Sequence, residues 1–222
     1  MGGIQLTVFY PYTQTKDDGL ELRFSIRSMV KHFTDMKAVI VVGEKPSWYT
    51  GDHIYFPDVE KRKEYSVLRK LLLVPADMGT PLTLLFCHDD VYALKDFDSS
   101  LPNYYRGTCR EGAMTTKERR FKDMFNTCPP DWLNFEIHAP MIINTELIED
   151  EDRDFLLKTT YANRNKLPGT DIADCKIKDD LYYSEARKII KGRPFWSTHD
   201  NAENGVLTML KELYPLKSIY ET

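Results

Sequence analysis

The chain has 222 residues, 42% of them hydrophobic, and a formal net charge of -4 at pH 7. This length suits one domain with its own hydrophobic core, and the composition excludes a disordered chain. The acidic balance provides no bulk positive field, so bulk nucleic-acid binding is not expected.

The four cysteines are dispersed along the chain and form no C-x-x-C pair, which argues against a zinc cluster or a disulfide framework. The N-terminus lacks the basic start and apolar run of a signal peptide, and no segment reaches the ~18 apolar residues of a membrane span. We therefore expect a cytoplasmic protein with free thiols and no membrane span.

The first half of the chain predicts six elements from its hydrophobic pattern. In order they are a strand at 4–10, a helix at 20–33, strands at 37–44 and 53–58, a helix from 62 that ends before Pro75, and a strand at 81–86. This order is typical of an α/β fold with a mostly parallel sheet. In such sheets ligands collect at the carboxyl ends of the strands.

The second half is less regular, with helices predicted at 115–125, 146–160, 182–190 and 204–213. No repeat, low-complexity tract or composition break marks a linker. We therefore predict a single domain over residues 1–222.

Two adjacent aspartates, Asp89 and Asp90, follow His88 at the end of the apolar run "LTLLF". Ionised carboxylates at the exit of a buried strand need a compensating cation, and hard oxygen ligands suit Mg²⁺ or Mn²⁺. The alternative is a turn in which one carboxylate caps a helix and the other is solvated.

The segment "FEIHAPMIIN" places Glu136 and His138 on the same side of a short extended stretch. Either side chain can act as a general base for an acceptor hydroxyl group when it is suitably placed. The alternative for His138 is a buried histidine that bonds to the backbone.

The segment "PFWSTHDN" ends in a second His-Asp pair, His199 and Asp200, which is a candidate for a further metal ligand or a substrate contact. Asp200 also precedes the helix predicted at 204–213, so an N-cap is the alternative. Three arginines, Arg23, Arg27 and Arg69, and the neighbouring Lys70 are candidates for phosphate contacts, although such residues usually lie on solvated helix faces.

Several common motifs are absent from the sequence. It has no P-loop, no G-x-G-x-x-G, no G-x-S-x-G and no H-E-x-x-H. The absence of these motifs argues against a P-loop NTPase, a dinucleotide dehydrogenase, a serine hydrolase with a nucleophile elbow, and a zincin.

The stretches "LELRFSIRSMVKHF", "KAVIVVGEKPSWY" and "LLFCHDDVYAL" resemble the GT-A class of nucleotide-sugar glycosyltransferases. They look most like the Stealth-type sugar and sugar-phosphate transferases of polysaccharide synthesis. "EIHAPMIIN" and the closing "YPLKSIYE" are similar to further short motifs of that family. The Asp-x-Asp metal motif of the class is represented here by His88, Asp89 and Asp90.

The resemblance implies a GT-A-like catalytic domain in which residues 1–98 bind a nucleoside-diphosphate sugar such as a UDP-sugar and residues 99–222 bind the acceptor. Asp90 and Asp89 would anchor Mn²⁺ or Mg²⁺ on the diphosphate, and the loop from Tyr10 to Thr15, with Tyr12 and Thr13, would hold the nucleoside.

In this resemblance His138 matches the histidine that precedes a proline in the family. It is the first candidate for a catalytic or acceptor-side role, with Glu136 and Asp200 as further candidates for the base. A sugar 1-phosphate transferase and a non-catalytic glycan- or nucleotide-binding module remain alternatives, and modified DNA is the least favoured acceptor.

Overall fold

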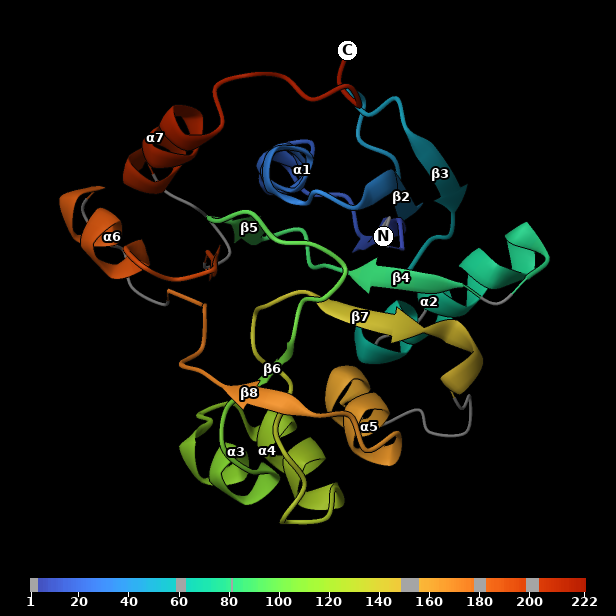
Figure 1. The fold of residues 1–222 in the computed structure, drawn as a ribbon, viewed down its shortest axis with the longest axis vertical. Helices are drawn as coiled ribbons and strands as arrows, with labels where there is room; N and C mark the ends of the chain where they lie inside the picture. The colour runs from blue at the N-terminus through green and yellow to red at the C-terminus, as the bar shows by residue number, and fades with distance from the viewer. Residues whose placement is uncertain (1–3, 59–62, 81, 149–155, 178–182, 199–203) are drawn as a thin grey trace.

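The computed structural model describes residues 4–58, 63–80, 82–148, 156–177, 183–198 and 204–222. A five-stranded sheet forms its centre (Figure 1). In spatial order the strands are β3 (Asp52–Tyr55), β2 (Met36–Gly43), β1 (Leu6–Tyr12), β4 (Thr83–Phe86) and β7 (Met141–Asn144). The first four run parallel and β7 runs antiparallel to β4. The chain is therefore an α/β protein with a mostly parallel sheet, which confirms the predicted fold class.

Helices cover both faces of this sheet because its strands are apolar on both sides. Val8 and its alternate neighbours on β1 pack with α1 (Leu20–His32) on one face. Phe9 packs on the other face with α2 (Lys63–Met78) and α5 (Leu157–Arg164). Each fully buried apolar side chain contributes about 1.5–3 kcal/mol. The sheet is thus the middle of three layers, and only its ends are open to a ligand.

Two small sheets and the remaining helices surround this centre. They are β5 (Val91–Ala93) with β9 (Phe195–Ser197), β6 (Asn103–Tyr105) with β8 (Gly169–Asp171), α3 (Cys109–Thr115), α4 (Arg119–Thr127), α6 (Tyr183–Ile190), α7 (Asn204–Leu213) and the 3-10 turn η1 (Thr145–Leu147). Helices α6 and α7 lie beside β5, while α3 and α4 lie together next to β6 and β8 (Figure 1). No described helix has the length and apolar character needed to cross a membrane.

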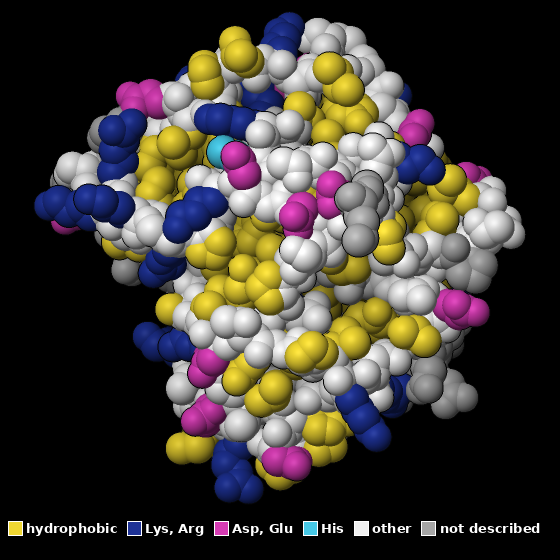
Figure 2. All heavy atoms as spheres, in the orientation of Figure 1, with side chains coloured by type: hydrophobic (Ala, Val, Ile, Leu, Met, Phe, Trp, Pro, Cys, Tyr) yellow, Lys and Arg dark blue, Asp and Glu magenta, His cyan; other side chains and the backbone are white. Residues whose placement is uncertain are grey.

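Surface charge is unevenly spread over the face in Figure 2. Lysine and arginine side chains gather along the edge formed by α6 and α7, and elsewhere they mix with aspartate, glutamate and apolar groups (Figure 2).

The structure corrects two predicted boundaries in the first half. Helix α2 runs through Pro75 to Met78, although the sequence predicts that it ends before the proline. Pro75 lies in the last turn, so it removes one hydrogen bond near the helix end, and the fully buried Leu71 and Val74 hold the turn in place. Strand β1 extends to Tyr12, two residues beyond its predicted end.

The second half contains a larger correction. The helix predicted at 115–125 corresponds to α4, which begins only at Arg119, because Thr116 is extended (φ -72, ψ 136) and ends a separate helix, α3, that the sequence does not predict. Thr108 and Glu111 form a capping box at the start of α3. The helix predicted at 146–160 corresponds to η1 and the first part of α5, and residues 149–155 lie outside the described residues.

Gly43 ends β2 in a conformation (φ 134) that side chains rarely adopt, and an added Cβ would lie 1.9 Å from the Tyr12 carbonyl oxygen. We expect Gly43→Ala to lower the free energy of unfolding by about 3 kcal/mol or more, through backbone strain and this clash. Gly79 (φ +70) is the matched control, because nothing lies within 4 Å of its added Cβ. Gly79→Ala should cost only about 1–2 kcal/mol in urea unfolding. Equal losses in the two variants would contradict the close approach at Gly43.

Candidate functional site

The sheet order places the candidate site at one crevice. Strand β1 pairs with β2 on one side and with β4 on the other, so the strand order reverses between β1 and β4. In open α/β sheets a ligand binds outside the carboxyl ends of the strands at such a switch point. Tyr12 and Thr13 lie at the end of β1, and His88, Asp89 and Asp90 follow β4. The carboxylate pair therefore occupies the position that the sequence predicts.

A tight turn connects β4 to β5 and presents the two aspartates. The Val91 N–H donates to the His88 carbonyl oxygen at 3.3 Å, which closes the turn around Asp89 and Asp90. Asp89 is partly exposed. Burial raises the pKa of Tyr12, and the charge of Asp89 adds to this rise, so Asp89 lies in the electrostatic range of the β1 end.

Asp90 is only 8% exposed and is held from the side of β9. Its Oδ2 accepts a hydrogen bond from Ser197 Oγ at 2.9 Å and lies 3.4 Å from Lys176 Nζ. Its main-chain oxygen also accepts a hydrogen bond from the Thr198 N–H at 3.2 Å. Both side-chain partners that the described residues provide contact Oδ2.

The donor set of the turn suits a divalent cation. Two adjacent carboxylates supply the hard oxygen ligands that Mg²⁺ and Mn²⁺ prefer. Within the described ranges, no group of three or more His, Cys, Asp or Glu side chains is placed to hold a metal ion. A cation held by Asp89 and Asp90 would therefore need further ligands from a substrate and water, as Mg²⁺ commonly takes, and metal binding stays a prediction.

The antiparallel pairing of β7 brings His138 to the same edge of the sheet. Phe86, the last residue of β4, pairs with Met141, the first residue of β7. The segment that precedes β7 therefore meets the segment that follows β4, and the rings of His88 and His138 lie 6.4 Å apart between centroids. A second histidine is thus placed beside the Asp89–Asp90 turn.

Asp174 orients the His138 ring. Its Oδ1 lies 3.1 Å from His138 Nδ1 and accepts a hydrogen bond from the His138 N–H at 3.2 Å. Because a carboxylate only accepts, Nδ1 carries the proton in this contact, and Nε2 of the neutral ring is left as a base. The side chain of His138 is 28% exposed, so an acceptor can reach it.

The carboxylate of Asp174 stays ionised at neutral pH. Burial acts to raise its pKa, but the hydrogen bond and charge of His138 and the backbone N–H groups of Lys176 and His138 outweigh this effect and hold the pKa well below the usual value. An ionised Asp174 stabilises the positive charge that His138 acquires when it takes up a proton.

Lys158 fixes the main chain on both sides of His138. It is 2% exposed, and its Nζ donates to the carbonyl oxygen of Ile137 and, at 3.3 Å, to that of Ala139. Burial lowers the pKa of Lys158, while the nearby charges of Glu136 and Asp174 act in the opposite direction. The ammonium group therefore holds the loop that carries the histidine.

Glu136, the other base predicted in this segment, contacts a helix end. Its Oε1 accepts a hydrogen bond from the Thr159 N–H at 3.0 Å, in the first turn of α5. A carboxylate at this position satisfies a free N–H group and interacts favourably with the helix dipole. The described contacts of Glu136 thus point toward α5, whereas those of His138 point toward Asp174.

The residues predicted to bind the nucleoside differ in exposure. Tyr10 is fully buried, and its hydroxyl lies 2.9 Å from Ser25 Oγ, so its side chain belongs to the core. Tyr12 is also buried, and its hydroxyl lies 3.4 Å from Thr15 Oγ1. Thr13 is exposed at the crevice and donates to Asp58. Within the predicted loop from Tyr10 to Thr15, solvent therefore reaches the side chains of Thr13, Gln14 and Thr15, and those of Tyr10 and Tyr12 are buried.

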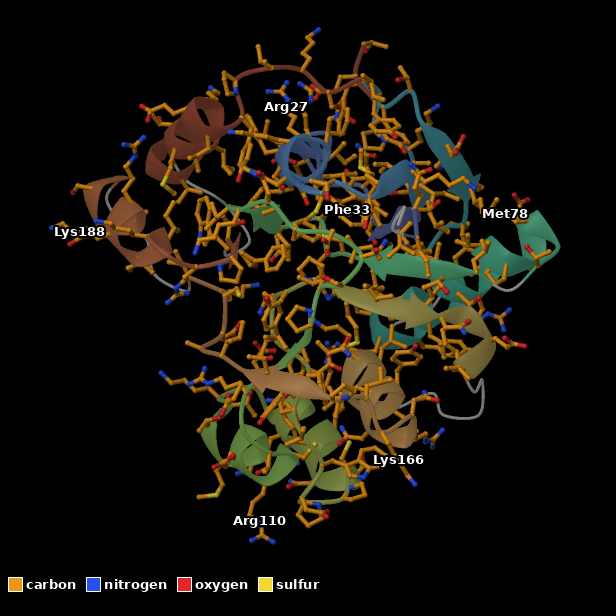
Figure 3. All side chains as sticks on the ribbon, viewed as in Figure 1. Arg27, Phe33, Met78, Arg110, Lys166 and Lys188 are labelled. Carbon is orange, nitrogen blue, oxygen red and sulfur yellow. The ribbon has the colours of Figure 1, made fainter. Side chains whose placement is uncertain are left out.

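The three arginines predicted to contact phosphates lie on two helices and make other contacts. Arg27 pairs with Glu221 through Nη2 at 2.6 Å and Nε at 2.8 Å, on the side of α1 toward the C-terminal segment (Figure 3). Arg23 lies over the Trp48 ring at 4.7 Å. Arg69 is exposed and lies 5.9 Å from the Tyr65 ring centroid.

His199 and Asp200, the third predicted constellation, lie outside the described residues. Ser197 and Thr198, which precede them, contact Asp90, so the chain enters this segment beside the carboxylate turn.

Sequence reasoning missed three residues that build the site, Asp174, Lys158 and Lys176. Asp174 and Lys176 belong to the segment "DIADCKIK", which carries no known motif and no clear periodicity. Lys158 lies within a predicted helix, where a lysine is normally expected to face solvent. The one available signal was the alternation of charged and apolar residues at 174–177, which is typical of an extended segment with one buried face.

Comparisons with known proteins add little. No protein-family model matches the chain, and no curated protein matches it. Among solved structures, one similar chain is a glycosyltransferase involved in the glycosylation of the major capsid of PBCV-1, with a TM-score of 0.42 and 10% identity over 96% of this chain and 100% of that chain. A likeness at this level carries no functional argument, and the resemblance to Stealth-type transferases stays a sequence-based prediction.

The Asp174 contacts predict a specific pH dependence. Because the folded-state pKa of Asp174 is lowered, its stabilising contribution is present above the unfolded pKa of about 3.9 and is lost as the pH falls below that value. We expect Asp174→Asn to lower the free energy of unfolding by about 1–3 kcal/mol at pH 7. Between pH 5 and pH 3, the free energy of unfolding should then fall less in this variant than in the wild type. Urea unfolding across this range measures both effects.

The matched control for this experiment is Asp171→Asn, since Asp171 is exposed. This variant should keep the wild-type dependence on acid. Identical acid slopes in the two variants would mean that the His138–Asp174 contact does not hold in solution.

Proposed function

We propose that this chain is a metal-dependent glycosyltransferase with a GT-A-like domain, which moves a sugar from a nucleoside-diphosphate sugar to an acceptor hydroxyl group. The observation that carries the proposal is one arrangement of side chains. A carboxylate pair, Asp89 and Asp90, stands at the switch point of the sheet, beside a histidine whose Nδ1 is held by Asp174. These are the groups needed to hold a diphosphate through a cation and to remove a proton from an acceptor.

The donor would bind in the crevice between the ends of β1 and β4. Asp89 and Asp90 would hold Mn²⁺ or Mg²⁺ together with the diphosphate oxygens, and the bound cation would neutralise the charge that develops on the leaving group. Thr13, which follows β1 and is exposed, would contact the nucleoside. In this scheme Tyr10 and Arg27 support the fold, because their polar groups contact Ser25 and Glu221.

The acceptor side would be built around His138. Its Nε2 would take the proton of the acceptor hydroxyl as that oxygen bonds to the anomeric carbon and the bond to the diphosphate breaks. Asp174 would stabilise the resulting imidazolium, and Lys158 would hold the loop in position. Residues 1–98 would then bind the donor, and residues 99–222 would bind the acceptor. The acceptor would be a glycan, a lipid-linked group or a small molecule.

Nucleotide release from a panel of UDP- and GDP-sugars with Mn²⁺ tests this proposal. We expect turnover that EDTA abolishes and that Asp90→Asn lowers at least 10²-fold, roughly the contribution of one preorganised electrostatic group. Asp77→Asn, an exposed carboxylate on α2, is the control and should leave turnover unchanged. A failure of every nucleotide sugar to bind at millimolar concentration would contradict the proposal.

The role of His138 has a matched control on the surface. His32 also contacts a carboxylate, with its Nδ1 2.8 Å from Asp96 Oδ1, but it lies on α1 outside the crevice. We expect His138→Gln to lower kcat by about 10²–10⁴-fold, the usual contribution of a general base. His32→Gln should leave kcat unchanged, and an equal effect of both substitutions would remove His138 from the mechanism.

The identity of the released nucleotide separates the alternatives. Release of the nucleoside diphosphate supports transfer of the sugar, whereas release of the monophosphate would show transfer of a sugar 1-phosphate. Tight binding of the nucleotide sugar with no release by any variant or acceptor would identify a binding module.

A further inference from the structure

A pocket is lined by residues of α3 and α4. These two helices lie at the end of the molecule away from α7 (Figure 1). Its volume is about 370 Å³, within the range of small-molecule sites. Its walls come from α3, α4 and the segment that follows α4, and they include Arg110, Lys122 and Cys128. None of its lining residues belongs to the crevice at β1 and β4.

The floor of the pocket is apolar and firmly packed. Ala113 and Phe125 line it and are each only 6% exposed. Gly112 lies against Phe125 so closely that an added Cβ would be 2.9 Å from a ring carbon. The capping box of Thr108 and Glu111 fixes the start of α3. The pocket is therefore formed by ordered helices and offers an aromatic ring to a ligand.

The rim of the pocket is cationic. Arg110 and Lys122 are both exposed and line the pocket, and neither makes an ion pair within the described ranges. Arg110 extends outward from this end of the molecule (Figure 3). Other cations of α4 are paired, since Arg119 contacts Asp123 and Arg120 contacts Glu64. The two positive charges at the rim thus form no ion pair with any described residue.

The polar groups of the lining match one class of ligand. Asn126 adds an amide donor, and no carboxylate is among the lining side chains, all of which lie in the described part of the chain. Two cationic groups balance the charge of a phosphate monoester dianion, whereas a carboxylate would balance only one of them. A guanidinium group also matches the oxygens of a phosphate with two parallel hydrogen bonds.

We propose that this pocket binds a phosphate monoester with an apolar body, in which Arg110 and Lys122 hold the phosphate and the apolar body lies against Phe125. The site is independent of the proposed transferase reaction. The ester can be a soluble molecule or the headgroup of a lipid, because both present the same chemistry.

Calorimetry with phenyl phosphate, benzyl alcohol and inorganic phosphate tests the proposal. Phenyl phosphate should bind at least 10-fold more tightly than either of the other two compounds, since only it uses both the cations and the aromatic floor. Arg110→Gln and Lys122→Gln should each weaken its binding about 5- to 10-fold. Lys117→Gln is the matched control, because Lys117 is an exposed cation between the same helices that does not line the pocket.

Alkylation of Cys128 locates the bound molecule. Cys128 lines the pocket and is partly exposed, whereas the other three cysteines are buried. Phenyl phosphate should slow its reaction with iodoacetamide in the wild type and in Asp90→Asn, but much less in Arg110→Gln. Protection that Asp90→Asn removes would place the ligand in the crevice at β4 and overturn the proposal.

Vesicles that contain phosphatidic acid distinguish the two sources of the ester. Protection of Cys128 by these vesicles, with the same dependence on Arg110 and Lys122, identifies a lipid headgroup, and protection by phenyl phosphate alone identifies a soluble ester. Equal binding of inorganic phosphate and phenyl phosphate, equal losses in Lys117→Gln and Lys122→Gln, or no protection by either probe would overturn the proposal.

Discussion

The antiparallel pairing of β7 with β4 is the constraint on which the candidate site depends. A parallel strand at this edge would begin at the opposite end of the sheet and would carry His138 away from the carboxylates. Because β7 runs against β4, the segment before it starts where β4 ends, and Phe86 faces Met141. Residues far apart in the sequence therefore meet at the carboxyl end of the parallel strands.

Two buried lysines each bind main-chain carbonyl oxygens at the carboxyl end of the parallel strands. Lys70 donates to the carbonyl oxygen of Tyr12 at 2.7 Å and pairs with Asp58 at 2.8 Å, at the end of β1. Lys158 donates to the carbonyl oxygens around His138. A buried ammonium group is costly unless hydrogen bonds satisfy it, so each lysine favours one arrangement of the loop that it contacts. The crevice is thus bordered by main chain that is held from inside the protein.

The predictable part of the fold and the site comes from local patterns. The apolar runs that form β1, β2 and β4 are continuous, as expected for strands covered on both faces, and the place of Asp89 and Asp90 follows from the end of such a run. The predicted end of α2 before Pro75 is wrong, because the tertiary packing of α2 outweighs the loss of one hydrogen bond near the end of the helix. The prediction for Tyr10 rests on its position before a polar loop, where an aromatic side chain often contacts a ligand. In the structure β1 extends beyond Tyr10, so its side chain lies in the core.

The partners of the site residues could not be predicted, because they depend on contacts across the fold. Asp174 reaches His138 from a segment near β8, and Ser197 reaches Asp90 through the pairing of β5 with β9. No local spacing records these contacts. The sequence therefore indicates which residue types can carry the chemistry. The tertiary structure determines which of these side chains are held in one orientation and which partners hold them.

Paramagnetic broadening by Mn²⁺ in the presence of UDP or GDP is the measurement that tests the central claim most directly. Mn²⁺ with the nucleoside diphosphate should broaden the amide signals of His88 to Val91 and of Ala139 first, and Mn²⁺ alone should broaden them far less, because the two carboxylates need the diphosphate to complete the site. Broadening that leaves these signals unchanged and appears elsewhere in the chain would contradict the account.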